Sequence, residues 1–190
     1  MIISPHMLKL ADKSKEVFVE KYIDKIPEIQ LSAPFKKGKE IHALANYFLS
    51  GQDISKLENA LDERNSKTWQ TLKNNQYFKM ECFASEYSLS AKLGDFWIGG
   101  RIDAIVKDKD NYYILDYKTG QIPENARYDY QTMVYLYCMD KKLKNYKSLN
   151  FVYLGLKDNF EEKITLTKEL KREYEQRLSN ACLKIKNLIT

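Results

Sequence analysis

The stretch "ILDYKTG", residues 114–120, raises the question on which the fold and function of this chain depend. An apolar segment ends in an acid and a lysine two residues apart, and a turn glycine follows at once. Residues two apart in a strand share a face, so Asp116 and Lys118 are expected to point the same way. The acid-x-Lys spacing occurs four times in the chain and selects nothing by itself. This pair differs from the others because it ends an apolar strand.

The segment "DFWIGGRIDAIV" (95–106) is expected to pair with "NYYILDYK" (111–118) as a hairpin. A two-residue loop at 109–110 would join them. Each segment has one apolar face, and burying both faces on one side of the sheet fixes the register to within two residues. The two apolar sets are Ile98, Ile102, Ala104 and Val106, and Tyr113, Leu115 and Tyr117.

Asp103, Asp116 and Lys118 are then expected on the opposite face, with the Cβ atoms of the two aspartates about 4.5–5.5 Å apart. Carboxylates this close repel, so one stays protonated or a cation lies between them. Mg²⁺ or Mn²⁺ suits such oxygen ligands. The same register puts Arg101 across from Lys118, which is unfavourable unless an anion such as phosphate lies there. A solvated surface network of acids and bases remains the alternative.

The rest of the chain alternates between strand-like and helical spacing. The segment 81–93 completes a three-stranded meander with the hairpin, 148–156 is expected as a buried strand and 161–166 as an edge strand. Helices are expected over 4–23, 32–51, 54–74, 124–142 and 167–189, with Pro34 near the first turn of the second and Gly51 past its end. This order predicts an α/β fold with a mixed central sheet, built on the meander and flanked by helices.

Length and composition set broad limits on the function. The 190 residues suit one domain, residues 1–190. The net charge of +5 and pI of about 8.9 mildly favour anionic partners such as nucleic acid. No apolar run approaches the roughly 20 residues that cross a bilayer, and the N-terminus lacks a secretion signal, so we expect a cytoplasmic protein with no membrane partner. Cys82, Cys138 and Cys182 have no metal-binding spacing and indicate buried thiols.

Four further polar residues are ordinary when each is taken singly. His42 lies in a helical segment, where a lone histidine is more often a core or boundary residue than a ligand. Gln131 and Tyr135, four apart, share a helix face just after the acid-lysine strand. Glu86 falls on the more polar face of the first meander strand, where a solvated glutamate is the default.

In combination, these residues resemble the PD-(D/E)XK nuclease superfamily, and in particular its RecB-like branch, with the nuclease domains of RecB and AddB and CRISPR-associated relatives. The matching pieces, in order, are "GKEIH" (38–42), "GGRIDAI" (99–105), "LDYKTG" (115–120) and "QTMVY" (131–135). The resemblance covers about residues 38–155, and "ISPHMLKL" (3–10) is similar more loosely.

The resemblance implies a restriction-endonuclease-like core and a role for each matched residue. Asp103 and Asp116 would hold the metal, with His42 and the backbone carbonyl of Tyr117 as further ligands. Lys118 would orient or activate the attacking water, so that it forms the catalytic set together with the two aspartates. 

The same resemblance implies residues that brace the site or touch the nucleic-acid backbone. These are Gln131, Tyr135, Glu86 and Arg101. The implied activity is Mg²⁺- or Mn²⁺-dependent hydrolysis of DNA phosphodiester bonds, of exonuclease type, in DNA repair, recombination or defence. The alternative is a nucleic-acid-binding module of the same fold that has lost activity. Relatives with an iron-sulfur cluster place four cysteines in a layout that this chain does not match, so no cluster is expected, and a helicase or other protein partner would act in trans.

Overall fold

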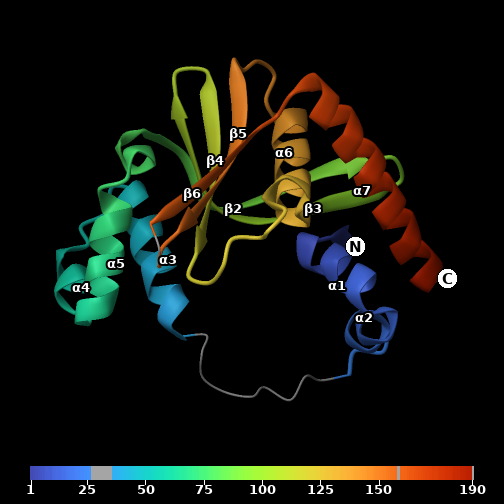
Figure 1. Cartoon of the computed structure of the whole chain (residues 1–190), viewed down its shortest axis with the longest axis horizontal. Coiled ribbons are helices and arrows are strands. Elements are labelled where there is room, and N and C mark those ends of the chain that lie inside the picture. Colours follow the sequence, from blue (N-terminus) through green and yellow to red (C-terminus); the bar gives the residue numbers. More distant parts are fainter. Residues whose placement is uncertain (27–35, 158, 190) are drawn as a thin grey trace.

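The computed structural model describes residues 1–26, 36–157 and 159–189, and within these ranges it shows a six-stranded sheet covered by helices (Figure 1). The strands are β1 (Ile2–Ile3), β2 (Glu81–Leu93), β3 (Phe96–Asp108), β4 (Asn111–Lys118), β5 (Ser148–Gly155) and β6 (Phe160–Thr165). They follow the order β1-β3-β4-β5-β6, with β2 on the other edge of β3. The pairs β1/β3 and β4/β5 are parallel and the rest antiparallel, so the predicted mixed sheet is confirmed.

The three-stranded meander is formed by β2, β3 and β4, as the sequence predicts. The bounds of β2 and β4 coincide with the segments expected from the alternation of apolar residues. The loop between β3 and β4 has two residues, and Lys109 in it has a φ of 55°, as tight hairpin turns require. Pairing from Asp108 with Asn111 to Ala104 with Leu115 gives the expected register.

The apolar faces of this hairpin are distributed differently from the prediction. The residues that pack together as expected are Ala104, Val106, Leu115 and Tyr117. Ile98 and Ile102 were expected on the same side, but they pack in the separate core on the other face of the sheet. Ile105 belongs to that core too, although it lies three residues from Ile102. A regular strand cannot direct residues three apart to one face, so β3 changes its alternation between them.

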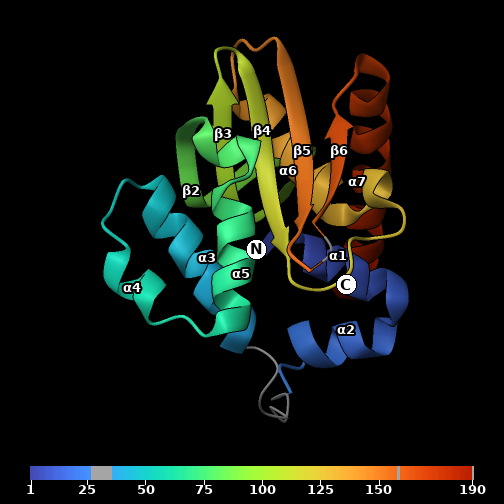
Figure 2. The same cartoon turned by 60° about the vertical axis from the view of Figure 1, so that its left-hand side comes forward.

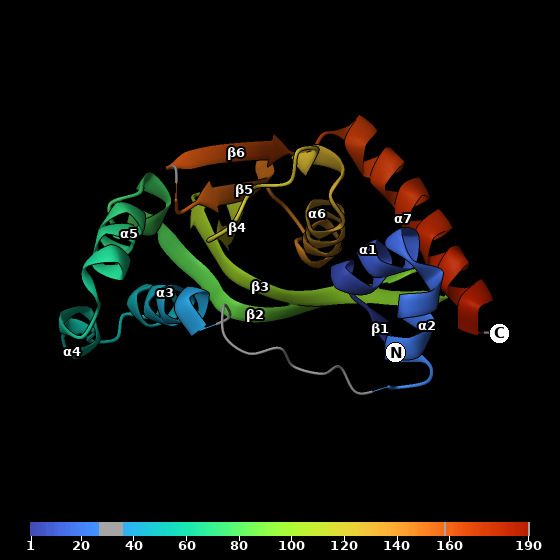
Figure 3. The same cartoon turned by 60° about the horizontal axis from the view of Figure 1, so that its bottom comes forward.

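Helices cover both faces of the sheet (Figure 2). On one face lie α1 (Pro5–Lys13), α2 (Lys15–Tyr22), α6 (Tyr130–Lys142) and α7 (Lys168–Ile189). On the other lie α3 (Lys36–Leu49), α4 (Ser55–Asn59) and α5 (Glu63–Lys73). Short 3₁₀ turns precede β2 (η1, Gln76–Lys79) and α6 (η2, Ala126–Tyr128). β2 and β3 are long and curved, and they extend from the helices α3 and α5 to the helices α1 and α2 (Figure 3).

Two of the helices expected from the sequence are each broken in two. Ser14 is extended, and it both ends α1 and begins α2, where its hydroxyl accepts the N–H of Val17 at 3.3 Å. Asp62 begins α5 in the same way. Serine and aspartate side chains bond to backbone N–H groups and so favour a new helix start. The spacing of apolar residues does not detect such caps, so the breaks were not predicted.

The helix expected over 32–51 is described only from Lys36, so residues 32–35 with Pro34 lie outside the described residues. Gly51 follows its end with a φ of 71°, as expected. The segment 124–142 becomes α-helical only at Tyr130. This late start matters because it sets which side chains of α6 face the end of β4.

Candidate active site

The site begins where β3 and β4 separate. Their pairing ends at Ala104 and Leu115, one residue before the two aspartates would meet. The Asp103 side chain then takes over as acceptor, since its Oδ2 accepts the N–H of Tyr117 at 2.8 Å. β4 continues beside β5 as far as Lys118. A carboxylate therefore lies in the fork between the two strands, rather than on the face that carries Asp116.

Glu86 on β2 lies beside this fork. The ladder between β2 and β3 omits Glu86 and Asp103, although the pairs on both sides of them are in register. Glu86 has a φ of 47°, a conformation that costs a non-glycine residue about 1–2 kcal/mol. This break in both strands brings the two carboxylates to one place. One ligand atom each from His42, Glu86 and Asp103 lies within 4.8 Å of the others.

His42 reaches the fork from α3. Its neighbours Ile41 and Ala45 are buried in the core between α3 and the sheet. This packing fixes the helix and directs His42 toward β4. Nε2 lies 3.1 Å from the backbone carbonyl of Tyr117, and Nδ1 lies 3.2 Å from Oδ1 of Asp103. Both partners only accept hydrogen bonds, so an imidazolium that donates from both nitrogens satisfies them together.

The charge of this ring follows from its surroundings. Burial lowers the pKa of His42, but the hydrogen bond and charge of Asp103, the charge of Asp116 and the Tyr117 carbonyl outweigh burial and raise the pKa above 6.5. The metal-free site therefore favours a positive charge between these acids.

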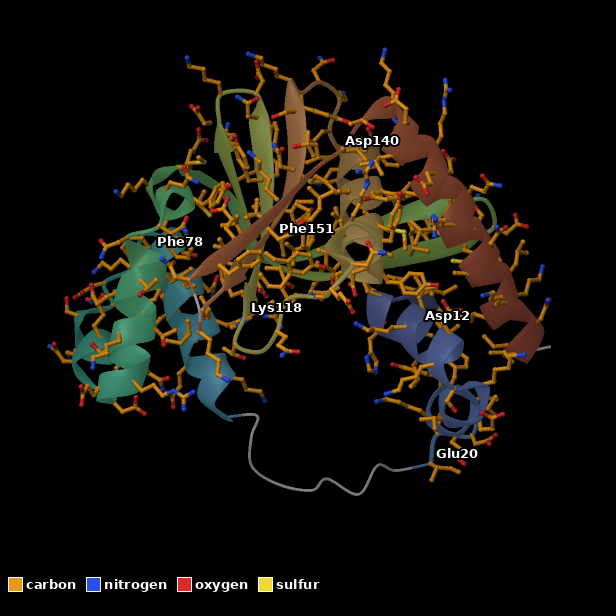
Figure 4. The ribbon with its side chains drawn as sticks, viewed as in Figure 1. Asp12, Glu20, Phe78, Lys118, Asp140 and Phe151 are labelled. Carbon is orange, nitrogen blue, oxygen red and sulfur yellow. The ribbon has the colours of Figure 1, made fainter. Side chains whose placement is uncertain are left out.

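Asp116, Lys118 and Gln131 form a closed network on the α6 side of β4. Oδ1 of Asp116 accepts from Gln131 Nε2 at 3.0 Å, and Lys118 Nζ lies 2.8 Å from Oδ2. Lys118 Nζ also donates to Gln131 Oε1 at 2.7 Å. Asp116 is only 8% exposed, which excludes a solvated surface pair. Figure 4 shows Lys118 at the end of β4, between α3 and α1 in that view.

Asp116 is an unfavourable carboxylate in this setting. Burial raises its pKa to about 6, the charge of Lys118 opposes the rise, and the charge of Asp103 adds to it. Asp116 is not part of the triad of His42, Glu86 and Asp103. The next residue, Tyr117, connects Asp116 to that triad. Its N–H donates to Asp103 and its carbonyl lies beside His42.

Arg101 does not lie where the sequence prediction placed it. It was expected across from Lys118, but the β3–β4 ladder ends before reaching it, and it pairs with Ser88 of β2 instead. Its Nε lies 2.5 Å from Oε2 of Glu86. The predicted pairing of two cations is therefore wrong, because the strands have separated before reaching them.

Tyr135 and Gln131 share a face of α6, as predicted, but they make different contacts. The Tyr135 hydroxyl donates to the backbone carbonyl of Arg101 at 3.0 Å and holds β3 against α6. Asp129, which was not among the predicted site residues, caps α6 and accepts the N–H of Gln131 at 2.9 Å. An aspartate just before a helical run is an N-cap signal that could have identified it.

The donor set suits a hard divalent ion. An imidazole nitrogen, carboxylate oxygens and a backbone carbonyl lie around one fork, and these are ligand types that Mg²⁺ or Mn²⁺ accepts. The pKa of His42 is raised by the hydrogen bond and charge of Asp103 and by the charge of Asp116, whereas the pKa of Asp116 is raised mainly by burial, with the charge of Asp103 adding to the rise. A cation bound there would offset the negative charge of these carboxylates, so the residues fit the ion.

This fold, with an acid-x-Lys strand beside a cluster of metal-binding residues, defines the class of the protein. The chain belongs to the PD-(D/E)XK nuclease superfamily, whose family model matches residues 2–189. Members of this class are nucleases that use divalent metal ions, and the His42, Glu86 and Asp103 cluster is a candidate for that ion. Nucleic acid is accordingly the substrate class that membership supports.

A solved structure supports the fold. A protein from Eubacterium rectale, provisionally named an exonuclease, matches all of this chain and 82% of its own, with 11% identity and a TM-score of 0.57. The structure of the protein SSO0001 matches 96% of this chain and 71% of its own at 16% identity, but its TM-score of 0.37 is too low to support an argument. No protein of curated function matches the chain. Within the described ranges, no helix has the length and apolar character to span a membrane.

Proposed function

We propose that the protein is a Mg²⁺- or Mn²⁺-dependent nuclease that hydrolyses DNA phosphodiester bonds, of the RecB-like exonuclease type. The observation that supports this most directly is that two groups of hydrogen-bonded side chains lie on either side of the Tyr117 backbone. The first is His42 with Asp103, and the second is Asp116 with Lys118 and Gln131. A surface ion pair, worth about 0–1 kcal/mol, would need no such placement.

The residues that would hold the ion are His42, Asp103, Asp116 and the carbonyl of Tyr117, with Glu86 near enough to join them. Bound there, the ion would act as a Lewis acid and lower the pKa of water. His42 would have to give up one of its two protons to act as a ligand, and its contact with Asp103 or with Tyr117 would be exchanged.

Lys118 and Gln131 are proposed to position the reacting groups. Lys118 Nζ has Asp116 and Gln131 at hydrogen-bond distance, so its compact charge is fixed beside the carboxylate. We assign it to orient the attacking water and to compensate charge growing on the phosphate. The water oxygen bonds to phosphorus, the bridging P–O bond breaks, and the leaving oxygen takes a proton, so one product keeps the phosphate and the other a hydroxyl.

The wider setting is also part of the proposal. Residues 1–190 would act as one nuclease domain in the cytoplasm, in DNA repair, recombination or defence, and a helicase or other protein could join it in trans. No iron-sulfur cluster is expected. The three cysteines, Cys82, Cys138 and Cys182, are too few for the four-cysteine layout of relatives that hold one.

The test is incubation of the purified protein with end-labelled single- and double-stranded DNA, linear and circular, with Mg²⁺, Mn²⁺ or chelator. Cleavage should require the metal, and Lys118→Ala should abolish it. Lys163→Ala is the matched control, because Lys163 is exposed on β6 and belongs to another acid-x-Lys pair. A Lys118→Ala protein that cleaves like the control would refute the catalytic assignment. Binding of DNA without any cleavage would instead support the inactive module.

A further inference from the structure

A cleft of about 390 Å³ opens beside the candidate active site, between α1, β3 and α6. It lies where β3 has a free edge. β1 covers this edge at Trp97 and Ile98, and β4 covers it from Ala104 to Asp108. Among the described residues, no strand pairs with the part of this edge between them, and Gly100 and Arg101 of that part line the cleft.

The cleft adjoins the candidate active site. Gln131 and Tyr135 line it, and Gln131 is the residue that contacts both Asp116 and Lys118. A ligand in the cleft would therefore lie one residue away from these two side chains. Its volume is at the small end of ligand pockets, which start at about 300 Å³, so it suits part of one strand rather than a base pair.

Two cations in its walls have long, exposed side chains. Lys9 comes from α1 and Arg101 from β3. Lys9 is 65% exposed and lies 3.2 Å from Asp129, while Arg101 is 68% exposed and pairs with Glu86. The acid partners are less exposed, at 9% for Asp129, which also lines the cleft, and 23% for Glu86, so it is the cations that can turn toward a phosphate. The first turn of α1 adds no acid that would oppose an anion.

We propose that this cleft seats the backbone phosphate next to the scissile one, on a single nucleic-acid strand that runs between α1 and α6. Arg101 and Lys9 contact that phosphate. The proposal rests on the proposed function for the identity of the strand, and it makes these two residues positioning residues, because they lie away from the reacting atoms. Such contacts raise affinity for any sequence and make it depend on salt.

The experiment measures binding of fluorescein-labelled single-stranded oligonucleotides, with a 5′-phosphate or a 5′-hydroxyl, over a series of NaCl concentrations. Every protein carries Asp116→Asn and is kept in chelator, so nothing is cleaved. Lys9→Gln and Arg101→Gln are compared with Lys67→Gln. Lys67 is the matched control because it is 77% exposed and paired with an acid, Glu63, but lies on α5 away from the cleft. Urea midpoints check folding, and Lys9→Gln carries the test alone if Arg101→Gln unfolds.

Each cleft variant should weaken binding roughly tenfold at low salt and reduce the salt slope by about one, while Lys67→Gln changes neither. Equal losses on both oligonucleotides assign the cleft to an internal phosphate. A loss confined to the 5′-phosphorylated strand assigns it to a terminal phosphate, which also supports the cleft. Cleft variants that bind like Lys67→Gln overturn the inference. Metal-dependent cleavage by the unmodified protein is assayed separately, so a failure of the proposed function is recognised independently.

Discussion

Asp103 and Tyr117 are joined by a hydrogen bond of 2.8 Å from a backbone N–H to a carboxylate, at the point where β3 and β4 separate. The carbonyl of the same tyrosine lies 3.1 Å from His42. Asp103 thus has two roles that can be measured apart. It replaces a missing backbone acceptor, and it contributes negative charge to the fork.

Substitution of Asp103 should separate these roles. Asp103→Ala leaves the N–H of Tyr117 without an acceptor and should lower the free energy of unfolding of the metal-free protein by about 1–3 kcal/mol. Asp103→Asn keeps an acceptor oxygen and should cost clearly less, although both variants should lose metal-dependent cleavage. Urea unfolding in chelator and a cleavage assay measure the two effects. Equal stabilities of the two variants would contradict the structural role.

The stability of the metal-free protein should depend on pH through two groups. The pKa of Asp116 rises from 3.8 to about 6, and that of His42 rises above 6.5. Both groups bind more protons in the folded state, so their contribution to stability falls with rising pH, from about 4 to 6 for Asp116 and from about 6.5 upward for His42. Urea unfolding of the protein and of His42→Asn across pH isolates the second part, which should be absent in the variant.

Metal binding should release protons for the same reason. A ligand histidine is neutral, so His42 must lose a proton that the metal-free fold retains. Affinity for Mn²⁺ should therefore fall as pH decreases through the raised pKa of His42. Calorimetry in two buffers of different ionisation enthalpy counts the protons. An equal heat of Mn²⁺ binding in both buffers at a pH near 6.5 would show that His42 does not change its protonation on binding.

Gly100 should matter through Tyr135 rather than through backbone freedom. A Cβ at position 100 would lie 2.7 Å from the Tyr135 hydroxyl, the group that donates to the Arg101 carbonyl. Gly100→Ala should therefore displace the ring and weaken DNA binding. Tyr135→Phe removes the atom nearest to the new methyl group, so adding Gly100→Ala to Tyr135→Phe should cost less than adding it to the unmodified protein. A double-mutant cycle of urea midpoints measures this coupling, and strictly additive costs would disprove it.

The meander could be predicted from the sequence because its signals are local. Alternating apolar residues and the turn at 109–110 gave the bounds of β2 and β4 and the register up to Ala104. The positions of Ile98 and Ile102 could not be predicted, because the alternation along β3 is interrupted between Ile102 and Ala104. The interruption lies opposite the left-handed backbone of Glu86, and glutamate carries no sequence signal for that conformation.

The candidate site could likewise be predicted only in part. The resemblance brought together His42, Asp103, Asp116, Lys118 and Gln131, and the structure places all five around one fork. Their individual contacts were not predictable, because they depend on where the ladder ends. Arg101 illustrates this, since its expected neighbour was Lys118 and its actual partner is Glu86 on another strand.

Asp116 should be more favourable for function than for stability. Asp116→Asn keeps an oxygen for Gln131 Nε2, and a buried charge with a raised pKa is removed. The new amide nitrogen replaces the oxygen nearest to Lys118, which keeps its bond to Gln131 Oε1. Because the raised pKa makes the ionised Asp116 costly to fold at neutral pH, this variant should gain about 1–3 kcal/mol in free energy of unfolding in chelator, and it should lose cleavage.

Asp140→Asn is the matched control. The Asp140 side chain is also only 6% exposed, but it lies 2.6 Å from Lys171 and accepts from the Tyr146 hydroxyl at 2.6 Å, so its substitution should destabilise the fold. Thermal melts of both variants in chelator and in Mn²⁺ provide the measurement. Mn²⁺ should stabilise the unmodified protein and Asp140→Asn but not Asp116→Asn, and an Asp116→Asn protein that melts below the unmodified one in chelator would show that the carboxylate supports the fold.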